Sequence, residues 1–167
     1  MHIRSLAAAL ALVTASLTGC ATVGSLPTQT SVDRTRTFEA PFDQVWPAII
    51  GEIAETNLKI TTLEKASGLI AIADSTYSPN DANEGVRGSV LGSPDQVGNR
   101  SASLNIFATS PTPNRTTVRV NVGLKMYIRT GNGSLAFPFV YKWEEAYSNG
   151  NIEKSLLDGI ARRTLQK

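Results

Sequence analysis

The sequence predicts an α+β fold in which a single antiparallel β-sheet carries an N-terminal and a C-terminal helix packed on one face. Three observations predict it. Apolar residues recur at helical spacing over 42–53 and again over 149–166, and several segments between them alternate between apolar and polar residues. Such alternation is typical of an antiparallel sheet with one covered and one wet face, and two helices supply the cover in a two-layer domain. The predicted element order is β-α-β(4–5)-α.

Residues 1–19 are predicted to be a cleavable lipoprotein signal peptide. One positive charge, at Arg4, precedes the apolar segment Leu6–Leu17. This segment is shorter than the roughly 20 residues that a bilayer-spanning helix needs. It closes with the small residues of Leu17-Thr18-Gly19-Cys20, as a secretory leader does. The alternative is an ordinary signal peptide in which the cysteine has no role.

The LTGC run resembles the lipobox of bacterial lipoproteins, whose cysteine receives diacylglycerol and becomes the first residue of the mature protein. The resemblance implies that Cys20 is the lipidation site and carries fatty acyl chains such as palmitate. Ala21 follows it in place of Asp, which by the sorting rule of such lipoproteins implies the outer membrane, with the domain facing the periplasm. Residues 20–36, rich in Ser, Thr, Gly and Pro, are predicted to form a lipidated flexible tether.

The domain is predicted to occupy 37–167, beginning with a short strand at 37–39 and a helix that ends at Asn57. Asp43 is the predicted cap of this helix. Trp46 lies on its apolar stripe and is interpreted as a core residue rather than a ligand platform. The stripe consists of Phe42, Val45, Trp46, Ile49, Ile50 and Ile53.

Two strands are predicted next, at 58–64 and 69–74, with a turn between them. The long segment 77–100 has no apolar periodicity. A loop of this length is usually either functional or disordered, and disorder is the prediction here. Deleting Pro79–Gly98 is then expected to leave thermal stability nearly unchanged.

The next strands are predicted at 101–109 and 115–129, and the second has the cleanest alternation in the chain. Its even-numbered apolar residues are predicted to face the core. Its outer face is a candidate surface for a protein partner or for lipid headgroups, and the alternative is an ordinary solvated face. The candidate residues are Arg119, Lys125, Tyr127 and Arg129.

The last strand is predicted at 135–142, where Pro138 limits it to an edge or an irregular segment. Glu144 and Glu145 are assigned to the loop that follows. The final helix is predicted over 149–166, with Arg162 and Arg163 near its end, where cations complement the helix dipole.

Two motifs give the domain a family resemblance. The run Phe38-x-Ala40-Pro41-Phe42-Asp43-x-Val45-Trp46-Pro47-Ala48, and after it Lys65-x-Ser67-Gly68-Leu69-Ile70, are similar to the helix-grip domains of BamC-type lipoproteins. Those proteins are accessory subunits of the machinery that inserts β-barrels into the outer membrane. They also have two such domains and a long partner-binding N-terminal segment, whereas this chain has one domain and a short tether. The resemblance therefore implies the fold more strongly than the partner.

The composition excludes several kinds of chemistry. The only His is His2, in the leader, and the only Cys is the predicted anchor. Ser-His and Cys-His catalysis, zinc sites of imidazole or thiolate, and axial haem ligation by His or Cys are therefore excluded from the mature domain. The formal net charge of +2 is too small to indicate nucleic-acid binding. No cofactor and no metal are predicted.

Two sets of carboxylates are candidates for acid–base or cation chemistry. Glu144 and Glu145 are adjacent, so on a strand they would point to opposite faces and would not share a proton. Four carboxylates flank the long loop and are the candidate cation ligands, but their spacing matches no calcium loop. They are Asp74, Asp81, Glu84 and Asp95.

The sequence therefore predicts a non-enzymatic outer-membrane lipoprotein that serves as a protein-docking or accessory component of the cell envelope. Its expected partners are the membrane, through the acyl anchor, and an envelope protein. One alternative is a periplasm-facing binding module for an apolar or lipid ligand, which requires an apolar cavity of roughly 300 Å³ or more. The other is a hydrolase that uses two carboxylates converging in one cleft.

Overall fold

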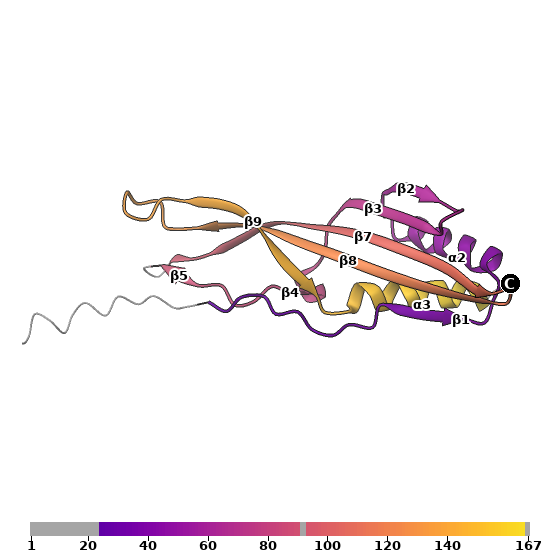
Figure 1. The fold of residues 1–167 in the computed structure, drawn as a ribbon. Coiled ribbons are helices and arrows are strands. Elements are labelled where there is room, and N and C mark those ends of the chain that lie inside the picture. Colours follow the sequence, from indigo (N-terminus) through magenta and orange to yellow (C-terminus); the bar gives the residue numbers. More distant parts are fainter. Residues whose placement is uncertain (1–23, 91–92, 166–167) are drawn as a thin grey trace, which may run out of the picture.

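A computed structural model describes residues 24–90 and 93–165 of the chain. Cys20 and the predicted leader lie outside the described residues. The described part is elongated, with both helices toward one end of the molecule and a long β-hairpin at the other (Figure 1).

An antiparallel sheet of seven strands forms the body of the described chain, and it confirms the α+β class. The order is β2-β3-β7-β8-β9-β4, and β1 also pairs with β8. The strands are β1 (Thr35–Phe38), β2 (Ile60–Glu64), β3 (Leu69–Ser75), β4 (Ala82–Asn83), β7 (Gln96–Thr112), β8 (Arg115–Thr130) and β9 (Val140–Ser148). A separate pair consists of β5 (Ser89–Val90) and β6 (Ser93–Pro94).

Two α-helices pack against each other and against the sheet. They are α2 (Phe42–Glu55) and α3 (Asn151–Leu165), and a short 3-10 helix, η2, spans Pro79–Asp81. Of the predicted stripe of α2, Val45, Trp46, Ile49 and Ile53 are buried, and Phe42 and Ile50 are partly buried. Trp46 is a core residue as expected, with its ring stacked on Phe42 at a centroid distance of 5.3 Å. None of the helices in the described ranges is long and apolar enough to cross a membrane.

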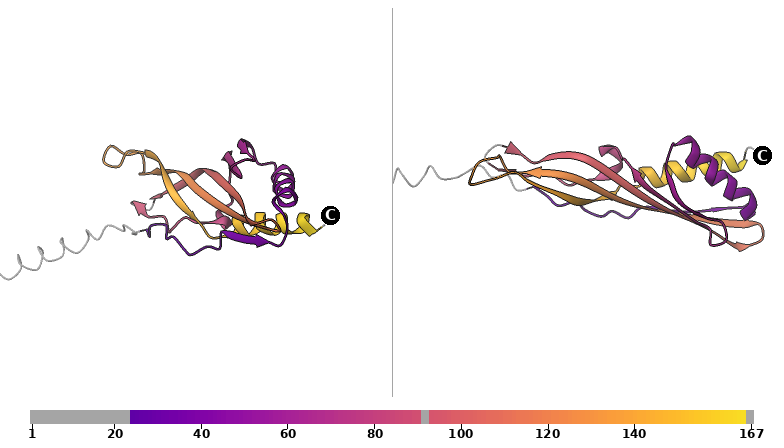
Figure 2. Two further views of the ribbon diagram at one scale, coloured as in Figure 1. Left: turned by 45° about the vertical axis from the view of Figure 1, so that its right-hand side comes forward. Right: turned by 90° about the horizontal axis from the view of Figure 1, so that it is seen from above.

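The strands β7 and β8 run through two different environments, seen from two directions in Figure 2. We call residues 102–112 of β7 and 115–124 of β8 the helix half. Residues 96–101 of β7 and 125–130 of β8, together with the part of β9 that pairs with them, are the hairpin half. In the helix half, β1 pairs with one edge of β8 at residues Thr116–Arg119. Further along β8, β9 pairs with the same edge at residues Leu124–Thr130. One strand thus presents the same edge to two successive partners.

The core extends through both halves. Alternate residues of β7 and β8 are buried together with the apolar stripes of α2 and α3, as the alternation predicted. The fully buried members include Ile49, Ile106, Val120 and Ile160 near the helices, and Met126 and Ile128 in the hairpin half.

The prediction of disorder for 77–100 is wrong for the described residues of this segment. It contains η2, β4, β5 and β6, and β7 begins within it at Gln96. Tyr77 and Arg100 both donate to the Glu84 carboxylate, and Arg87 donates to Glu144. Long-range ion pairs rather than an apolar period hold the segment, and periodicity does not reveal them.

The tether prediction differs from the structure from Gly24 onward. Ser25 forms an isolated antiparallel bridge with Val86. The Asn83 side chain donates to Thr30 Oγ1 at 3.2 Å, and the Val120 amide donates to the Arg34 carbonyl at 2.8 Å. This part of the chain has no core side chains, so its contacts are backbone and polar ones that composition does not predict.

The last strand lies further along the chain than predicted. Residues 131–139 form a turn, and β9 contains Trp143, Glu144 and Glu145. The Phe137 carbonyl accepts from the amides of Asn132 and Gly133 at 3.1 and 3.0 Å. Both Gly131 and Gly133 have positive φ, and the turn that contains them extends past Pro138, so the strand begins at Val140.

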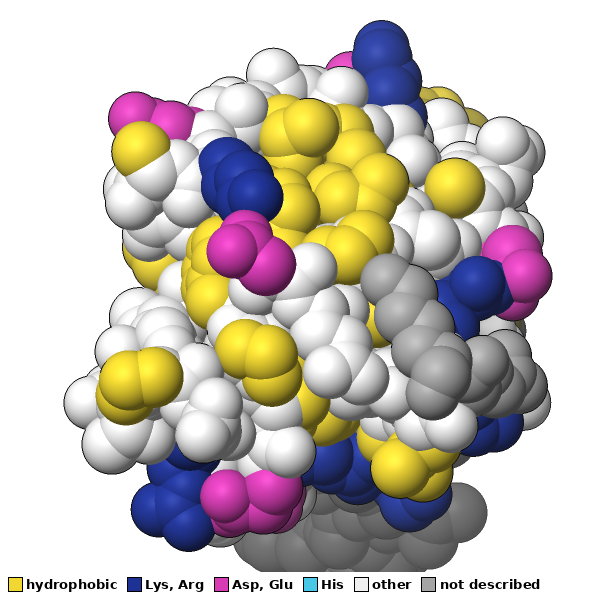
Figure 3. All heavy atoms as spheres, turned by 90° about the vertical axis from the view of Figure 1, so that its right-hand side faces the viewer, with side chains coloured by type: hydrophobic (Ala, Val, Ile, Leu, Met, Phe, Trp, Pro, Cys, Tyr) yellow, Lys and Arg dark blue, Asp and Glu magenta, His cyan; other side chains and the backbone are white. Residues whose placement is uncertain are grey.

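The end that carries the helices has a hydrophobic surface. Figure 3 shows hydrophobic side chains gathered there, with a few charged side chains around and among them. The beginning of α2 and the end of α3 meet where Gln44 Nε2 donates to the Thr164 carbonyl at 3.0 Å. The next residue, Leu165, is exposed, and so is Leu63 of β2.

Candidate functional site

The four residues of the candidate surface share the outer face of β8 but do not form one cluster. Arg119 lies opposite Thr35 and Phe107 in the helix half, whereas Arg129 lies opposite Tyr141 in the hairpin half. Ten residues separate the two arginines, which is about 33 Å along a strand. Arg119 donates to its neighbour Asn121 at 3.1 Å. It therefore belongs to a different part of the surface.

The hairpin half of this face carries an aromatic cluster. The Tyr127 ring lies 5.2 Å from Trp143 and 6.0 Å from Tyr141, centroid to centroid. The Arg129 guanidinium lies 4.5 Å above the Phe139 ring, within cation–π range. We call these five residues the aromatic face. Of these five residues, the sequence predicted only Tyr127 and Arg129. The predicted last strand ended at Lys142, before Trp143, and Pro138 limited the segment that contains Phe139 and Tyr141 to an edge or an irregular segment. The period-two pattern Tyr141-x-Trp143-x-Glu145-x-Tyr147 was the missed signal.

The turn next to the aromatic face exposes a continuous apolar run, Leu135–Tyr141. Such a run is unfavourable on a solvated surface unless it has a function. From Arg129 to Trp143 the chain contains no Asp or Glu, and its charged residues are Arg129 and Lys142. The exposed fractions of the large side chains are 105% for Leu135, 42% for Phe137, 44% for Phe139, 50% for Val140, 54% for Tyr141 and 51% for Trp143.

A network of charged residues supports the opposite face of the hairpin half. Arg100 of β7 forms two hydrogen bonds to the Glu84 carboxylate, at 2.6 and 2.9 Å, and Tyr77 donates to the same carboxylate at 3.0 Å. Arg87 contacts the Glu84 carbonyl and reaches Glu144 of β9 at 3.0 Å. The segment around Glu84 is therefore held over Met126 and Ile128, which lie on this face.

The network shifts the titration of its members. The hydrogen bonds from Arg100 are the main cause that lowers the pKa of Glu84, so this carboxyl is ionised at neutral pH. Burial, reinforced by the hydrogen bond to Glu84, raises the pKa of the Tyr77 hydroxyl. Bonds from Lys142 and Arg87 also lower the pKa of Glu144. Each charge has a partner, which is the pattern of a structural network rather than of an acid–base pair.

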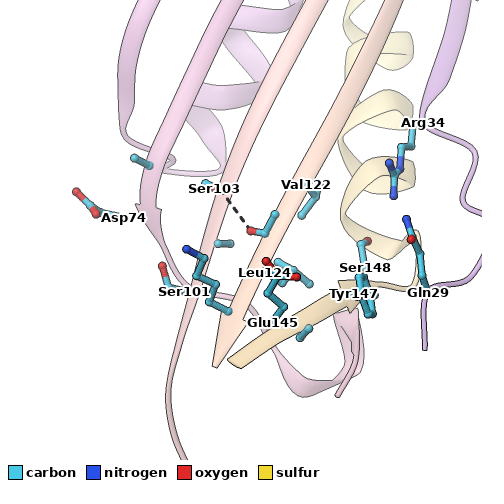
Figure 4. A pocket seen from close by; sticks show the side chains of 15 residues that line it. Gln29, Arg34, Asp74, Ser101, Ser103, Val122, Leu124, Glu145, Tyr147 and Ser148 are labelled. Carbon is cyan, nitrogen blue, oxygen red and sulfur yellow. Dashed lines mark hydrogen bonds between the residues drawn. The ribbon is translucent and has the colours of Figure 1, made fainter. Parts of the chain in front are cut away.

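A polar cleft of about 400 Å³ opens beside the edge of β8, between the end of β1 and the start of its pairing with β9 (Figure 4). Arg34, Ser101 and Lys125 contribute to its wall. The Ser103 hydroxyl donates to the Gly123 carbonyl at 3.5 Å. Asp74 and Glu145 both border the cleft, but Asp74 points away from it, so the two carboxylates do not converge.

The remaining carboxylates considered for chemistry are separated. Glu144 and Glu145 point to opposite faces, as expected for neighbours on a strand, although that strand was predicted to be a loop. The Glu84 carboxylate accepts hydrogen bonds from Arg100 and Tyr77. Asp81 accepts from the Ser78 amide at 3.1 Å. Among the described residues, no group of three or more His, Cys, Asp or Glu is arranged to hold a metal ion.

An apolar cleft lies between the start of α3 and strands β3 and β7. Leu104, Ile152 and Leu156 line it together with Tyr77 and several hydroxyl side chains. Its volume is about 250 Å³, which is below the roughly 300 Å³ expected of a small-molecule site.

In the described part of the chain, the end strand β2 offers an open edge of the sheet at the end that carries the helices. β2 is the end strand of the order, and in the described part of the chain only β3 pairs with it. The four residues Thr61–Glu64 are exposed, and the side chain of Leu63 is 53% exposed. An unpaired edge with an exposed apolar residue is a template for strand addition by a partner.

Comparison of the chain with protein-family models and with curated proteins finds no match.

Proposed function

We propose that the protein is a non-enzymatic outer-membrane lipoprotein, held by acylated Cys20 and facing the periplasm, whose domain docks an envelope protein. In this proposal both helices cover one face of the sheet, in a helix-grip arrangement like that of BamC-type lipoproteins. The LTGC run supports the anchor, and stable anchoring follows because a diacylated cysteine carries two chains.

The open edge of β2 is the observation that carries the docking proposal. Gly24, four residues after Cys20, lies toward the hairpin end of the molecule, and β2 lies toward the other end (Figure 1). A partner that adds a strand to β2 would therefore bind away from the anchored end. The exposed Leu63 and the hydrophobic end surface offer apolar contacts beside that edge.

Two alternatives have less support. A hydrolase needs converging carboxylates, and Asp74 and Glu145 point apart at the polar cleft. A module for an apolar ligand needs a larger apolar cavity than the 250 Å³ cleft beside α3. Docking requires neither, so it is the function that the described residues favour.

Site-specific photo-crosslinking in intact cells tests the docking. A photoreactive amino acid in place of Leu63 should give a discrete crosslink to an envelope protein. The control places it at Asn105, which is exposed on the outer face of the central strand β7. The same bands at both positions, or none at Leu63, would contradict docking at this edge.

The anchor has its own test. Cys20→Ala should abolish acylation and release the protein from the membrane fraction. A Cys20→Ala protein that still sediments with membranes would show that the attachment does not depend on this cysteine.

A further inference from the structure

We infer that the apolar turn and the aromatic face form a second membrane contact, which lies in the headgroup region of the anionic lipid surface that holds Cys20. The inference rests on the proposed function, because it requires the anchor. It adds the part of the domain that touches the bilayer and hence the orientation in which β2 is presented.

Position is the first argument. Gly24 is four residues after Cys20, and four residue steps of fully extended chain span about 14 Å. Gly24 and Ser25 lie against the segment 85–88, through the bridge of Ser25 with Val86. Arg87 of that segment is bonded to Glu144, the neighbour of Trp143 in β9. An acylated Cys20 would therefore hold the bilayer close to the hairpin end.

The composition of the surface is the second argument. Apolar side chains that reach into lipid, with Tyr and Trp beside them, are typical of membrane interfaces, because the amphipathic rings favour the headgroup level. Here the exposed run Leu135–Tyr141 lies at the turn, and Tyr127 and Trp143 follow it along the sheet. Burying each large side chain removes apolar surface from water, which stabilises the contact.

Charge is the third argument. Arg129 lies beside the apolar turn, and no carboxylate lies between Arg129 and Trp143 in the sequence, whereas Lys142 is paired with Glu144 at 2.7 Å. Each basic residue near an anionic lipid surface contributes attraction that decays within a Debye length. Membrane affinity increases when acyl chains act together with a protein surface that also binds the bilayer. This face would therefore strengthen the attachment through acylated Cys20 and restrict rotation of the domain about it.

The test measures how far Trp143 enters the bilayer. Acylated protein is reconstituted into vesicles of phosphatidylethanolamine and phosphatidylglycerol, with or without bromine on the acyl chains near the glycerol, and tryptophan fluorescence is recorded. The second tryptophan, Trp46, is 7% exposed in the core and serves as an internal reference. We expect the Trp143 emission to fall about twofold in brominated vesicles, and Trp143→Phe to abolish the quenching.

Matched variants separate this contact from general proximity to the vesicle. Phe107→Trp in the Trp143→Phe background puts a tryptophan on the same outer face in the helix half, at a position that is 40% exposed. It should not be quenched. Leu135→Asp, at a fully exposed side chain, should reduce the quenching of Trp143 without changing thermal stability.

Each outcome has one meaning. Acylated protein in the vesicle fraction with unquenched Trp143 would overturn this inference and leave the anchor intact. The same result together with a protein crosslink at Trp143 in cells would make the aromatic face a protein-docking surface instead. A mass of the mature N-terminus that lacks acyl chains would overturn the proposed anchor, and this inference with it.

Discussion

The helix half and the hairpin half of the sheet use the same two strands but are covered in different ways. In the helix half, the inner residues Ile106 and Val120 are buried with the apolar stripes of α2 and α3. In the hairpin half, Met126 and Ile128 continue the same alternation, and a segment held by Arg100–Glu84 and Arg87–Glu144 pairs lies on that side. Alternation along a strand therefore indicates that one face is covered, but it does not identify the cover.

The outer faces differ as well. The helix half presents polar and charged residues such as Asn105 and Arg119, together with Phe107, whereas the hairpin half presents the aromatic face. The two halves of the same strands therefore differ on both the inner and the outer face. The following changes test that difference, from the largest expected effect to the smallest.

Deleting Pro79–Gly98 should destabilise the protein strongly, opposite to the result expected for a disordered loop. The deletion removes Glu84 and Arg87 and uncovers Met126, Ile128 and Tyr77. Exposing large apolar side chains costs about 1.5–3 kcal/mol each, so we expect a loss of about 5 kcal/mol or more in urea unfolding. An unchanged unfolding midpoint would mean that this segment does not cover the hairpin half.

Ile106→Ala should cost about 2–5 kcal/mol, because the side chain is fully buried in the helix half and the substitution leaves a cavity. Phe107→Ala is the control on the adjacent, outward-facing position. It should change the free energy of unfolding by less than about 1 kcal/mol. Equal losses in the two variants would contradict the assignment of inner and outer faces.

Glu84→Gln should cost about 1.5–3 kcal/mol, because it weakens two charge-assisted hydrogen bonds and leaves Arg100 without its ion pair. Tyr77→Phe removes one hydrogen bond to the same carboxylate and should cost about 1 kcal/mol. Amide hydrogen exchange should speed up mainly at 77–100 in both variants. A uniform increase that includes α2 would show that the two halves are not energetically distinct.

Acid should weaken the hairpin half through the same carboxylate. Arg100 lowers the pKa of Glu84 in the folded state, so the stabilisation is present above the unfolded pKa of about 4.3. It is lost as the pH falls through the lower folded value. The urea midpoint should therefore drop between pH 5 and 3 by more in the wild type than in Glu84→Gln. Parallel pH profiles would assign the acid sensitivity to other groups.

Arg115→Ala should have the smallest effect. Arg115 forms hydrogen bonds to Glu39 at 2.7 and 3.0 Å, but both side chains are exposed at the end of the helix half. Surface ion pairs of this kind add little stability because water and salt screen them. The melting temperature should be unchanged within error, and a clear fall would give this pair a structural role that its exposure does not suggest.

Residue spacing was sufficient to predict the buried face of an element whose periodicity lies within its own segment. The stripe of α2 follows from spacings of three and four residues, and the inner and outer faces of β8 follow from its period of two. The turn at 131–139 was harder, because the left-handed glycines and the bonds at Phe137 decide where β9 begins. As a consequence, the predicted strand ends at Lys142 and leaves Trp143 out of the aromatic face.

The sequence by itself determined the α+β class, the buried faces of α2 and β8, and that His2 and Cys20 supply the only imidazole and the only thiol, since these depend on composition and on short-range periodicity. Only the tertiary structure decided that the described residues of 77–100 are packed, that the four candidate residues of β8 divide between two surfaces, and that aromatic side chains from β8 and β9 meet. The physical reason is that ion pairs such as Arg87–Glu144 join residues 57 positions apart, and no local period records such a contact.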